Sequence, residues 1–324
     1  MFPIRDTTAS KNYPVVNTAI IAVNVLVYLL QTAQGTYLER FIFIYGLVPA
    51  RYSVAQLAER FTFGQQAFSF LSFMFLHGGF WHLLGNMWSL YIFGDNVEDR
   101  MGPIRYLAFY LLCGVISGLS HLALNLESPV PTIGASGAIA GVMGAYFLLY
   151  PSARILTLIP IIFIPYFIEI PAYVFLGIWF FLQFLNAAGS SGAAGGVAWW
   201  AHIGGFVAGM ILIKLFTRAP SSGLTKMIRP ATEKHKTPRL QSIRTSAQMD
   251  DPNIYGSIVI TPEEALKGTN KLVNVPWGFH NRLVRVTVPP GIREGMTLRL
   301  EGIGRQLGDI RGDLLLKVSI QGHQ

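Results

Sequence analysis

Six long apolar segments dominate the first two thirds of the chain and restrict the folds that are open to it. They lie near Val15–Ala33, Gly79–Gly94, Pro103–Asn125, Gly134–Tyr150, Ile170–Leu185 and Val197–Phe216. Several approach the ~20 residues with which an α-helix crosses a bilayer. Hydrophobic residues make up 52% of the chain and charged residues only 13%, against about 25% charge in ordinary soluble domains. We therefore predict an α-helical polytopic membrane protein with six transmembrane helices.

The first segment is expected to remain as an anchor, because its apolar run is too long for a cleaved signal peptide and five further segments follow. A shorter apolar stretch, Ile155–Phe167, contains Pro160 and Pro165, which interrupt helices. This stretch suits an interfacial or re-entrant segment, although a seventh transmembrane span is also possible.

The basic residues that flank the segments indicate how the chain crosses the membrane. A cytoplasmic N-terminus puts more of them inside than outside, as the positive-inside rule favours. The inside set is Arg5, Lys11, Arg100, Arg105, Arg154, Lys214, Arg218, Lys226 and Arg229, and the outside set is Arg40, Arg51 and Arg60. Six crossings return the chain to the cytoplasm. We expect a multi-pass protein of the plasma (inner) membrane with both termini cytoplasmic and its active site open to the outside.

Polar side chains gather at the outward ends of three of these segments. His82 and Asn86 are four residues apart and therefore share a helix face, and His77 comes just before them. Ser136 opens the fourth segment, and His202 lies about one turn into the sixth. Ionisable and polar groups inside a membrane are costly and usually face a bundle interior or a wet cavity. These residues are expected on the same side of the membrane and at a similar depth. They therefore predict a site with a nucleophile, a base and two further hydrogen-bond donors.

Each of these residues also has an interpretation in which it only packs. Serine is common in membrane helices, Gly137-x-x-x-Gly141 is a packing motif, and His202 or the pair His82 and Asn86 could simply bond a neighbouring helix. Small residues recur along one face of each helix, namely Ser136, Ala140 and Gly144 on the fourth segment and His202, Gly205 and Gly209 on the sixth. Such faces let backbones approach closely, which a serine and an imidazole need to reach roughly 2.6 to 3.2 Å. Packing and catalysis are therefore compatible.

The fourth segment is short for a span. Its 17 residues, Gly134–Tyr150, give a helix of roughly 25 Å, against a hydrocarbon core of ~30 Å. Ser136 would then start below the membrane surface. Hydrolysis at that depth requires a polar cavity that admits water from outside.

Four motifs together resemble the rhomboid family of intramembrane serine proteases. They are GASG at Gly134–Gly137, the run His-x-x-x-x-His-x-x-x-Asn from His77 to Asn86, GDNVEDRMG at Gly94–Gly102 and AHIGGFVAG at Ala201–Gly209, within a match from about Tyr13 to Phe216. The resemblance implies that Ser136 is the nucleophile and His202 its general base, in a dyad without an acidic third member. It implies that His82 and Asn86, with the backbone N–H of Ser136, form the oxyanion hole, and we expect His77 to line the cavity.

The same resemblance assigns other parts of the chain. Glu98 and Arg100 match a structural position in the loop after the second span, and Thr36–Phe68 corresponds to a membrane-embedded first loop. Trp199 and Trp200 fit an aromatic belt at the outer interface. The implied substrates are single-span or other transmembrane proteins whose helix unwinds near small or helix-breaking residues.

Other functions are disfavoured by the sequence. Cys113 is the only cysteine, so an internal disulfide and a cysteine-rich metal cage are excluded. A zinc site from His77, His82 and His202 is conceivable, but Glu169, the one acid near a span, falls on the opposite side. A transporter would be favoured by inverted repeats, and we see none. We expect neither a cofactor nor nucleic-acid binding. A catalytically silent rhomboid fold that holds membrane clients is the competing function.

The last third of the chain has a different character. Nearly all of the net charge of +8 lies there, because Lys and Arg outnumber Asp and Glu by 9 to 8 before Arg218 and by 16 to 9 from that residue on. Residues 218–249, which follow a membrane domain of residues 1–217, have the composition of a basic flexible linker that could lie against anionic lipid.

Residues 250–324 alternate in short runs that predict a small all-β domain on the cytoplasmic side. Thr261-Pro-Glu-Glu264 predicts a capped helix within it. The stretches ITPEEALKGT, VPPGIREGMTLRLEGIG and GDLLLKVSI resemble the carboxy-terminal β-domain of DnaJ-type co-chaperones. That resemblance implies weak binding of extended peptide, whereas a folded cap or dimerisation unit without clients is equally compatible.

Overall fold

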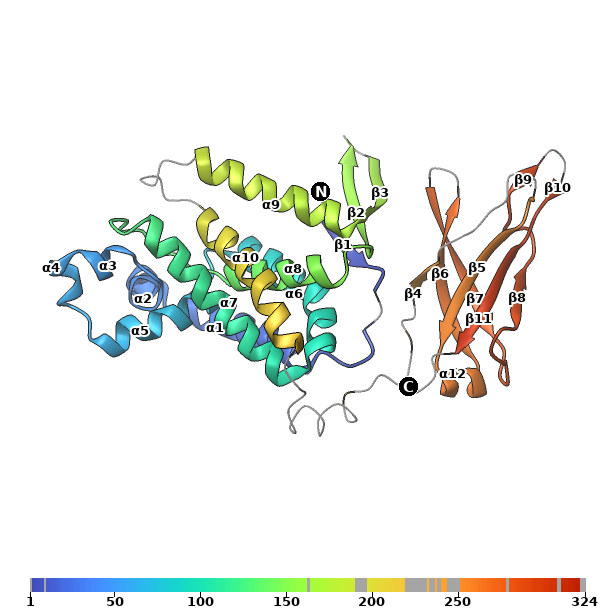
Figure 1. The fold of residues 1–324 in the computed structure, drawn as a ribbon, viewed down its shortest axis with the longest axis horizontal. Coiled ribbons are helices and arrows are strands. Elements are labelled where there is room, and N and C mark those ends of the chain that lie inside the picture. The colour runs from blue at the N-terminus through green and yellow to red at the C-terminus, as the bar shows by residue number, and fades with distance from the viewer. Residues whose placement is uncertain are drawn as a thin grey trace. The chain divides into compact units, whose positions relative to one another are not determined.

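The computed structural model describes residues 2–8, 10–161, 164–189, 197–218, 232, 237, 240–243, 251–277, 280–307 and 310–320. The chain forms two compact units (Figure 1). The first, which is mainly helical, comprises Phe2–Thr157 and Glu169–Glu233. The second comprises Lys234–Gln324 with Met1 and Leu158–Ile168, and it is rich in β-strands.

All six predicted apolar segments are helical. They form α1 (Val15–Thr32), α6 (Phe80–Met101), α7 (Pro103–Leu124), α8 (Ser136–Leu149), α9 (Ala172–Gly189) and α10 (Trp199–Arg218). By length and composition α1, α7, α9 and α10 could each cross a membrane. A fifth crossing results if Phe63–Phe75 and Phe80–Met101, which meet at 81°, are one broken span. The described residues thus contain four or five candidate spans, and six remains a prediction.

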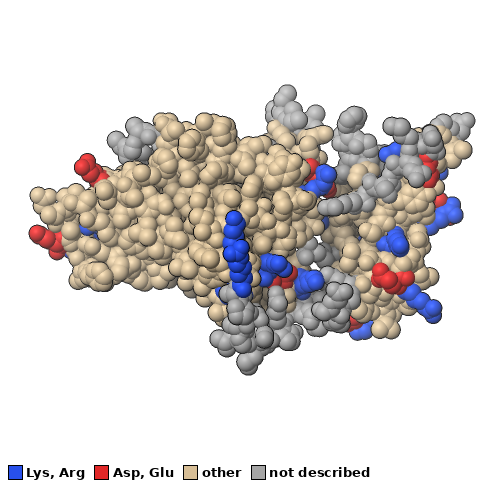
Figure 2. Space-filling view, in the orientation of Figure 1, with Lys and Arg blue, Asp and Glu red and all other residues tan. Residues whose placement is uncertain are grey.

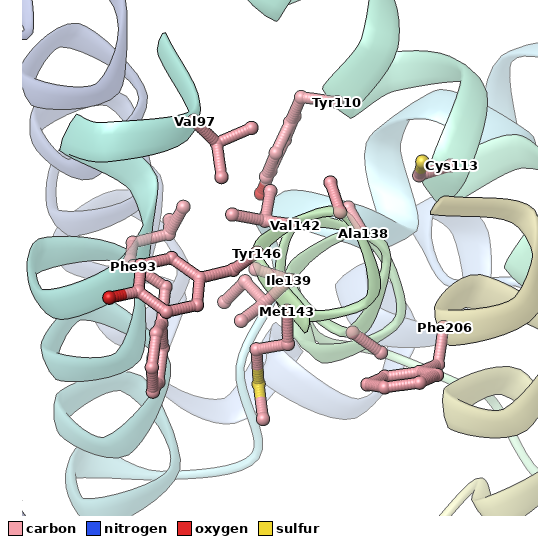
Figure 3. Close-up of a cluster of buried hydrophobic side chains, with 14 of the residues drawn as sticks. Phe93, Val97, Tyr110, Cys113, Ala138, Ile139, Val142, Met143, Tyr146 and Phe206 are labelled. Atoms are coloured by element: carbon pink, nitrogen blue, oxygen red, sulfur yellow. The ribbon is translucent and has the colours of Figure 1, made fainter. Parts of the chain in front are cut away.

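Helix α8 is shorter than the candidate spans and lies at the centre of the helical unit. Every residue from Gly137 to Tyr146 is buried. A helix that is apolar on all sides is stable only when it is enclosed. Figure 3 shows Phe93 and Val97 of α6, Tyr110 and Cys113 of α7 and Phe206 of α10 around it. Ser136 is therefore held at the first turn of the most enclosed helix.

The predicted first loop, Thr36–Phe68, folds into short helices. These helices and their neighbours are η1 (Gly35–Tyr37), α2 (Leu38–Tyr45), α3 (Ala50–Ser53), α4 (Ala55–Ala58), α5 (Phe63–Ser72) and η2 (Phe73–Phe75). The fully buried guanidinium of Arg51 donates to the carbonyl oxygens of Phe43 and Ile44 at the end of α2. It also lies 3.6 Å from the ring centre of Phe61. A cation at a helix C-terminus is stabilising, so Arg51 holds this segment together.

Helix α6 extends seven residues beyond the predicted segment and includes the residues that we expected in a loop. Glu98 is buried on this helix and accepts hydrogen bonds from the backbone N–H groups of Val16 (3.1 Å) and Asn17 (2.7 Å). Helix α1 has no N-terminal cap of its own because Pro14 precedes it, so the Glu98 carboxylate satisfies its free amides. The structural role of Glu98 agrees with the prediction, whereas its placement in a loop was wrong.

The described residues of Ile155–Phe167 do not form a helical span, and an interfacial position remains a prediction. They lie in β2 (Arg154–Ile161) and β3 (Ile164–Pro171), in a sheet of order β1-β2-β3 with β1 (Phe2–Asp6). Isoleucine-rich runs favour extended backbone, and proline disfavours a helix interior. Nearly all residues of this stretch are apolar, so the alternation of polar and apolar residues that indicates a strand is too weak to be recognised in the sequence.

The second unit confirms the predicted β-rich module. Its two main sheets have the orders β5-β11-β8 and β4-β6-β7, and side chains from both form one buried cluster. Its elements are β4 (Leu240–Ser242), β5 (Ile254–Ile260), α12 (Pro262–Lys267), β6 (Thr269–Trp277), β7 (His280–Val288), β8 (Thr297–Leu300), β9 (Gln306–Leu307), β10 (Ile310–Arg311) and β11 (Leu314–Ile320). The predicted capping box of Thr261 and Glu264 is present.

Part of the expected linker belongs to this sheet. Strand β4 lies within residues 218–249 and pairs in parallel with β6, where Leu240 is opposite Leu272. Before it, Thr237 is buried and donates to the carboxylate of Glu264, which also pairs with buried Lys271. A buried ion pair is stable only with further hydrogen bonds, and Thr237 forms three of them, two to Glu264 and one from Lys271. The β-rich unit therefore begins before residue 250.

Candidate active site

Ser136 is the first residue of α8 and follows a tight turn. Gly134 has φ of 129°, a conformation that side chains rarely adopt, and its N–H donates to the carbonyl of Phe73 at 2.9 Å. A Cβ atom at Gly134 would lie 2.9 Å from the ring of His82. Glycine is thus required both for the turn and for the approach of His82. The GASG motif presents the Ser136 hydroxyl at the start of a buried helix.

His202 lies in the first turn of α10 and is buried, with 8% of its surface exposed. Its Nε2 atom is 2.8 Å from Oγ of Ser136, within reach for proton transfer. The two backbones can approach because glycines face each other. A Cβ at Gly205 would lie 2.0 Å from the carbonyl oxygen of Gly137, and one at Gly209 would lie 1.9 Å from that of Gly141. The expected small-residue contact between these helices is therefore present, but Gly205 and Gly209 meet Gly137 and Gly141 of α8, which lie outside the predicted stripe of Ser136, Ala140 and Gly144.

Helix α9 supplies two residues that the sequence analysis missed. Gln183 is buried, and its Oε1 lies 2.8 Å from Nδ1 of His202. The indole ring of Trp179, one turn earlier, lies 6.0 Å from the imidazole ring at an angle of 33°. A glutamine inside an otherwise apolar helix is the signal that could have identified this partner.

His82 and Asn86 lie on one face of α6, as predicted, and both line the cavity that contains Ser136 and His202. The amide nitrogen of Asn86 is buried and has no hydrogen-bond partner among the described residues. Nδ1 of His82 lies 3.2 Å from the backbone nitrogen of Gly78, which donates to it. A neutral imidazole carries one proton, so the proton of His82 is on Nε2.

His77 does not occupy the expected position. It is fully buried, its ring lies 5.2 Å from that of His82, and it is absent from the described lining of the cavity. Its backbone forms two hydrogen bonds with the side-chain amide of Gln31 on α1, at 2.6 and 3.0 Å. The backbone of this residue therefore anchors the entry to α6, whereas its side chain packs behind His82.

The cavity has a volume of about 740 Å³. Besides the residues above, α7 contributes Ser117 and His121, and Asn125 directly after this helix continues the polar stripe at four-residue spacing. Trp199 and Trp200 also line it. Within the described ranges, no three His, Cys, Asp or Glu side chains are grouped so as to hold a metal ion. The arrangement offers a hydroxyl, a base in contact with it and free N–H donors in one polar space.

Comparison with known proteins agrees with these features. Residues 64–219 match the family model described as rhomboid domain, and residues 254–324 match that of the DnaJ C terminal domain. Rhomboid protein 1, mitochondrial, of Saccharomyces cerevisiae is 30% identical over 152 residues, which cover 44% of this chain and 40% of that protein. RHOMBOID-like protein 6, mitochondrial, of Arabidopsis thaliana is 32% identical over 163 residues, covering 49% and 47%.

A human relative, presenilin-associated rhomboid-like protein, mitochondrial, is 30% identical over 152 residues, covering 46% of this chain and 36% of the relative. The chain thus spans less than half the length of each of these three relatives. The matched segment contains α6, α8 and α10, which carry Ser136, His202, His82 and Asn86. This chain contains a rhomboid domain, which is followed by a DnaJ C terminal domain.

Proposed function

We propose that this chain is an intramembrane serine endopeptidase that hydrolyses peptide bonds in or next to the transmembrane segments of other proteins. The observation that carries the proposal is the 2.8 Å contact between Oγ of Ser136 and Nε2 of His202 at a polar cavity. Helices apolar enough to cross a membrane surround this cavity, and Figure 2 shows few charged side chains on the visible face of the helical unit.

In the proposed reaction, Nε2 of His202 takes the hydroxyl proton of Ser136 while Oγ adds to the carbonyl carbon of the scissile peptide bond. The imidazolium then gives this proton to the leaving amine as the C–N bond breaks, which leaves an acyl ester on Ser136. A water molecule, deprotonated by the same nitrogen, adds to the ester. The C–O bond then breaks, and the proton returns to Oγ. The reaction needs no cofactor.

Two side chains are suited to hold the oxyanion of the tetrahedral intermediates. The Nδ1 atom of His82 accepts from Gly78, so its Nε2–H is free to donate, and this end of the ring lies against Gly134, two residues before the nucleophile. The unpaired amide of Asn86 is a second donor. Each such donor is worth a factor of roughly 10² to 10³ in kcat in other serine enzymes.

The proposal includes an orientation and a substrate class. The excess of basic residues supports an orientation with both termini in the cytoplasm and the cavity open to the outside, which we propose for the plasma (inner) membrane. Substrates would be single-span or other transmembrane proteins. The DnaJ C terminal domain would bind extended peptide of such substrates on the cytoplasmic side. The names of the three relatives above include the word mitochondrial. Cell fractionation that separates plasma membranes from mitochondrial membranes therefore tests the proposed location.

The decisive experiment is cleavage of a panel of single-span substrates by the purified chain in detergent, together with labelling by a fluorophosphonate probe. Ser136→Ala should abolish both signals. Ser89→Ala is a matched control, because Ser89 lines the same cavity but its hydroxyl donates to the carbonyl of Gly85 at 2.9 Å. Cleavage retained by Ser136→Ala would refute the serine mechanism. A wild type that neither cleaves nor labels would favour a silent client-binding protein.

A further inference from the structure

We infer that Gln183 of α9 is a positioning residue that fixes which nitrogen of His202 carries the proton and so leaves the other free to act as the base. The inference rests on the proposed function for its catalytic consequence. The hydrogen-bond pattern that supports it does not depend on any activity.

The orientation of the Gln183 amide follows from its own helix. Its nitrogen Nε2 donates to the carbonyl oxygen of Trp179 at 3.1 Å. Rotating the amide by 180° would bring two oxygen atoms, neither of which can donate, into contact. The Oε1 atom therefore points toward His202, and it can only accept.

This orientation determines the tautomer of His202. The distance between Nδ1 of His202 and Oε1 of Gln183 is 2.8 Å, so Nδ1 must be the donor. A neutral imidazole has a single N–H group, and Nε2 is then left with its lone pair. This lone pair faces the hydroxyl of Ser136 at 2.8 Å. Proton abstraction from Ser136 requires this tautomer and no other.

A neutral partner suits the environment better than a carboxylate would. Gln183 has 6% of its surface exposed and His202 has 8%. A buried carboxylate would carry a desolvation cost and would favour the imidazolium, which is not a base, so that activity would begin only at higher pH. The titratable groups that face His202 are His82 of α6 and His121 of α7, and no Asp or Glu belongs to the described lining of the cavity.

The same face of α9 also covers the imidazole ring. Trp179 and Gln183 are four residues apart, so both point in one direction from the helix. The tryptophan ring lies 6.0 Å from that of His202, a distance at which an aromatic face attracts the imidazolium formed during the reaction. The protonation and orientation of the base are thus determined by a helix that carries neither the nucleophile nor the base.

The test compares three variants of the full-length protein in detergent. Gln183→Met keeps the volume and removes the acceptor, and we expect kcat to fall roughly 10- to 100-fold with KM nearly unchanged. Gln183→Glu keeps an acceptor. It should retain cleavage and move the acidic limb of the kcat/KM profile to higher pH, because a carboxylate favours the imidazolium. Asn186→Leu is the matched control, since Asn186 on the same helix also donates to a carbonyl one turn earlier, Leu182, but is exposed.

A second measurement separates this inference from the proposed function. Nitrogen-15 NMR of imidazole-labelled protein, with His202 assigned by its loss in His202→Gln, should show the Nδ1–H tautomer in the wild type and a loss of that preference in Gln183→Met. An Nε2–H tautomer in the wild type overturns the inference whether or not the protein cleaves any substrate. Unchanged kcat and an unchanged pH profile in Gln183→Met also overturn it, provided that the wild type is active and Ser136→Ala is not.

Discussion

A single methyl group at Gly205 tests whether the close approach of α8 and α10 creates the catalytic pair. In Gly205→Ala the new carbon would lie 2.0 Å from the carbonyl oxygen of Gly137. Ordinary contact begins near 3.4 Å, so the backbones must separate locally by about 1.4 Å or rotate. Ser136 and His202 sit on these same turns, and their 2.8 Å contact would then exceed the range of a hydrogen bond.

A misplacement of about 1 Å in an active site can reduce the rate by roughly 10²-fold, and overpacking of a core costs about 1–3 kcal/mol. We therefore expect Gly205→Ala to lose fluorophosphonate labelling and substrate cleavage by about two orders of magnitude, with a lower Tm. Gly177→Ala is the matched control, because Gly177 lies in helix α9 and a Cβ there would meet no atom within 4 Å. Wild-type labelling and Tm in Gly205→Ala would refute the argument that packing positions the pair.

Three further predictions address other parts of the molecule. Asn86→Ala should lower kcat by roughly 10²-fold at constant KM, because an oxyanion donor acts on the transition state, whereas a raised KM at constant kcat would make Asn86 a substrate-binding residue. Burial raises the pKa of Asp6 in β1 to about 7, despite the hydrogen bond that it accepts from Tyr146. Its ordinary value is 3.8, so the folded state keeps a proton that the unfolded state has lost. Stability should therefore fall as pH rises from about 4 to 7, and Tm measured across this range should vary less in Asp6→Asn than in the wild type. Truncation after Glu233, where the helical unit ends, should leave probe labelling within about twofold but reduce cleavage of substrates with long cytoplasmic tails. Equal changes for substrates with and without tails would exclude the proposed role of the β-rich module.

The positions of Ser136 and His202 were predictable because each lies near the start of its own helix. Two helices that begin at the same side of a membrane run parallel and bring their first turns to a similar depth, so sequence position converts directly into height. The small residues along both helices supplied the remaining requirement, since they indicated that the two backbones can approach, although Gly137 and Gly141 of the actual contact lie outside the predicted stripe. These two kinds of information made a contact between residues 66 positions apart feasible, and the resemblance to the rhomboid family identified Ser136 and His202 as the pair.

The sequence predictions were wrong in two kinds of region. In one, polar residues lie on a helix that was expected to be apolar throughout, and in the other, an apolar stretch forms strands instead of a membrane segment. The acids between Gly94 and Gly102 looked like a loop, yet Glu98 lies on α6, where its carboxylate binds the free backbone amides at the start of α1. Conversely, Ile155–Phe167 looked like a membrane segment, although its residues form strands in a sheet with β1. In both regions the partner lies near the N-terminus. Local composition cannot reveal a partner that is more than 80 residues away.

The role of Gln183 could not be predicted from the sequence, because it depends on which face of α9 points toward His202, and composition does not specify that. Gln183 and Asn186 are both amides in an apolar helix, and each satisfies its nitrogen with the carbonyl one turn earlier. Three residues advance a helix by about 300°, so the two side chains point only about 60° apart. A small rotation of α9 would have placed the shorter Asn186 nearer to His202. Glutamine has one more methylene group than asparagine, which lets its oxygen reach a neighbouring helix while its nitrogen remains bonded to its own. The packing of Trp179 against His202 and Phe206, with ring centres 6.0 Å apart in both cases, sets this rotation, and the amide follows from it.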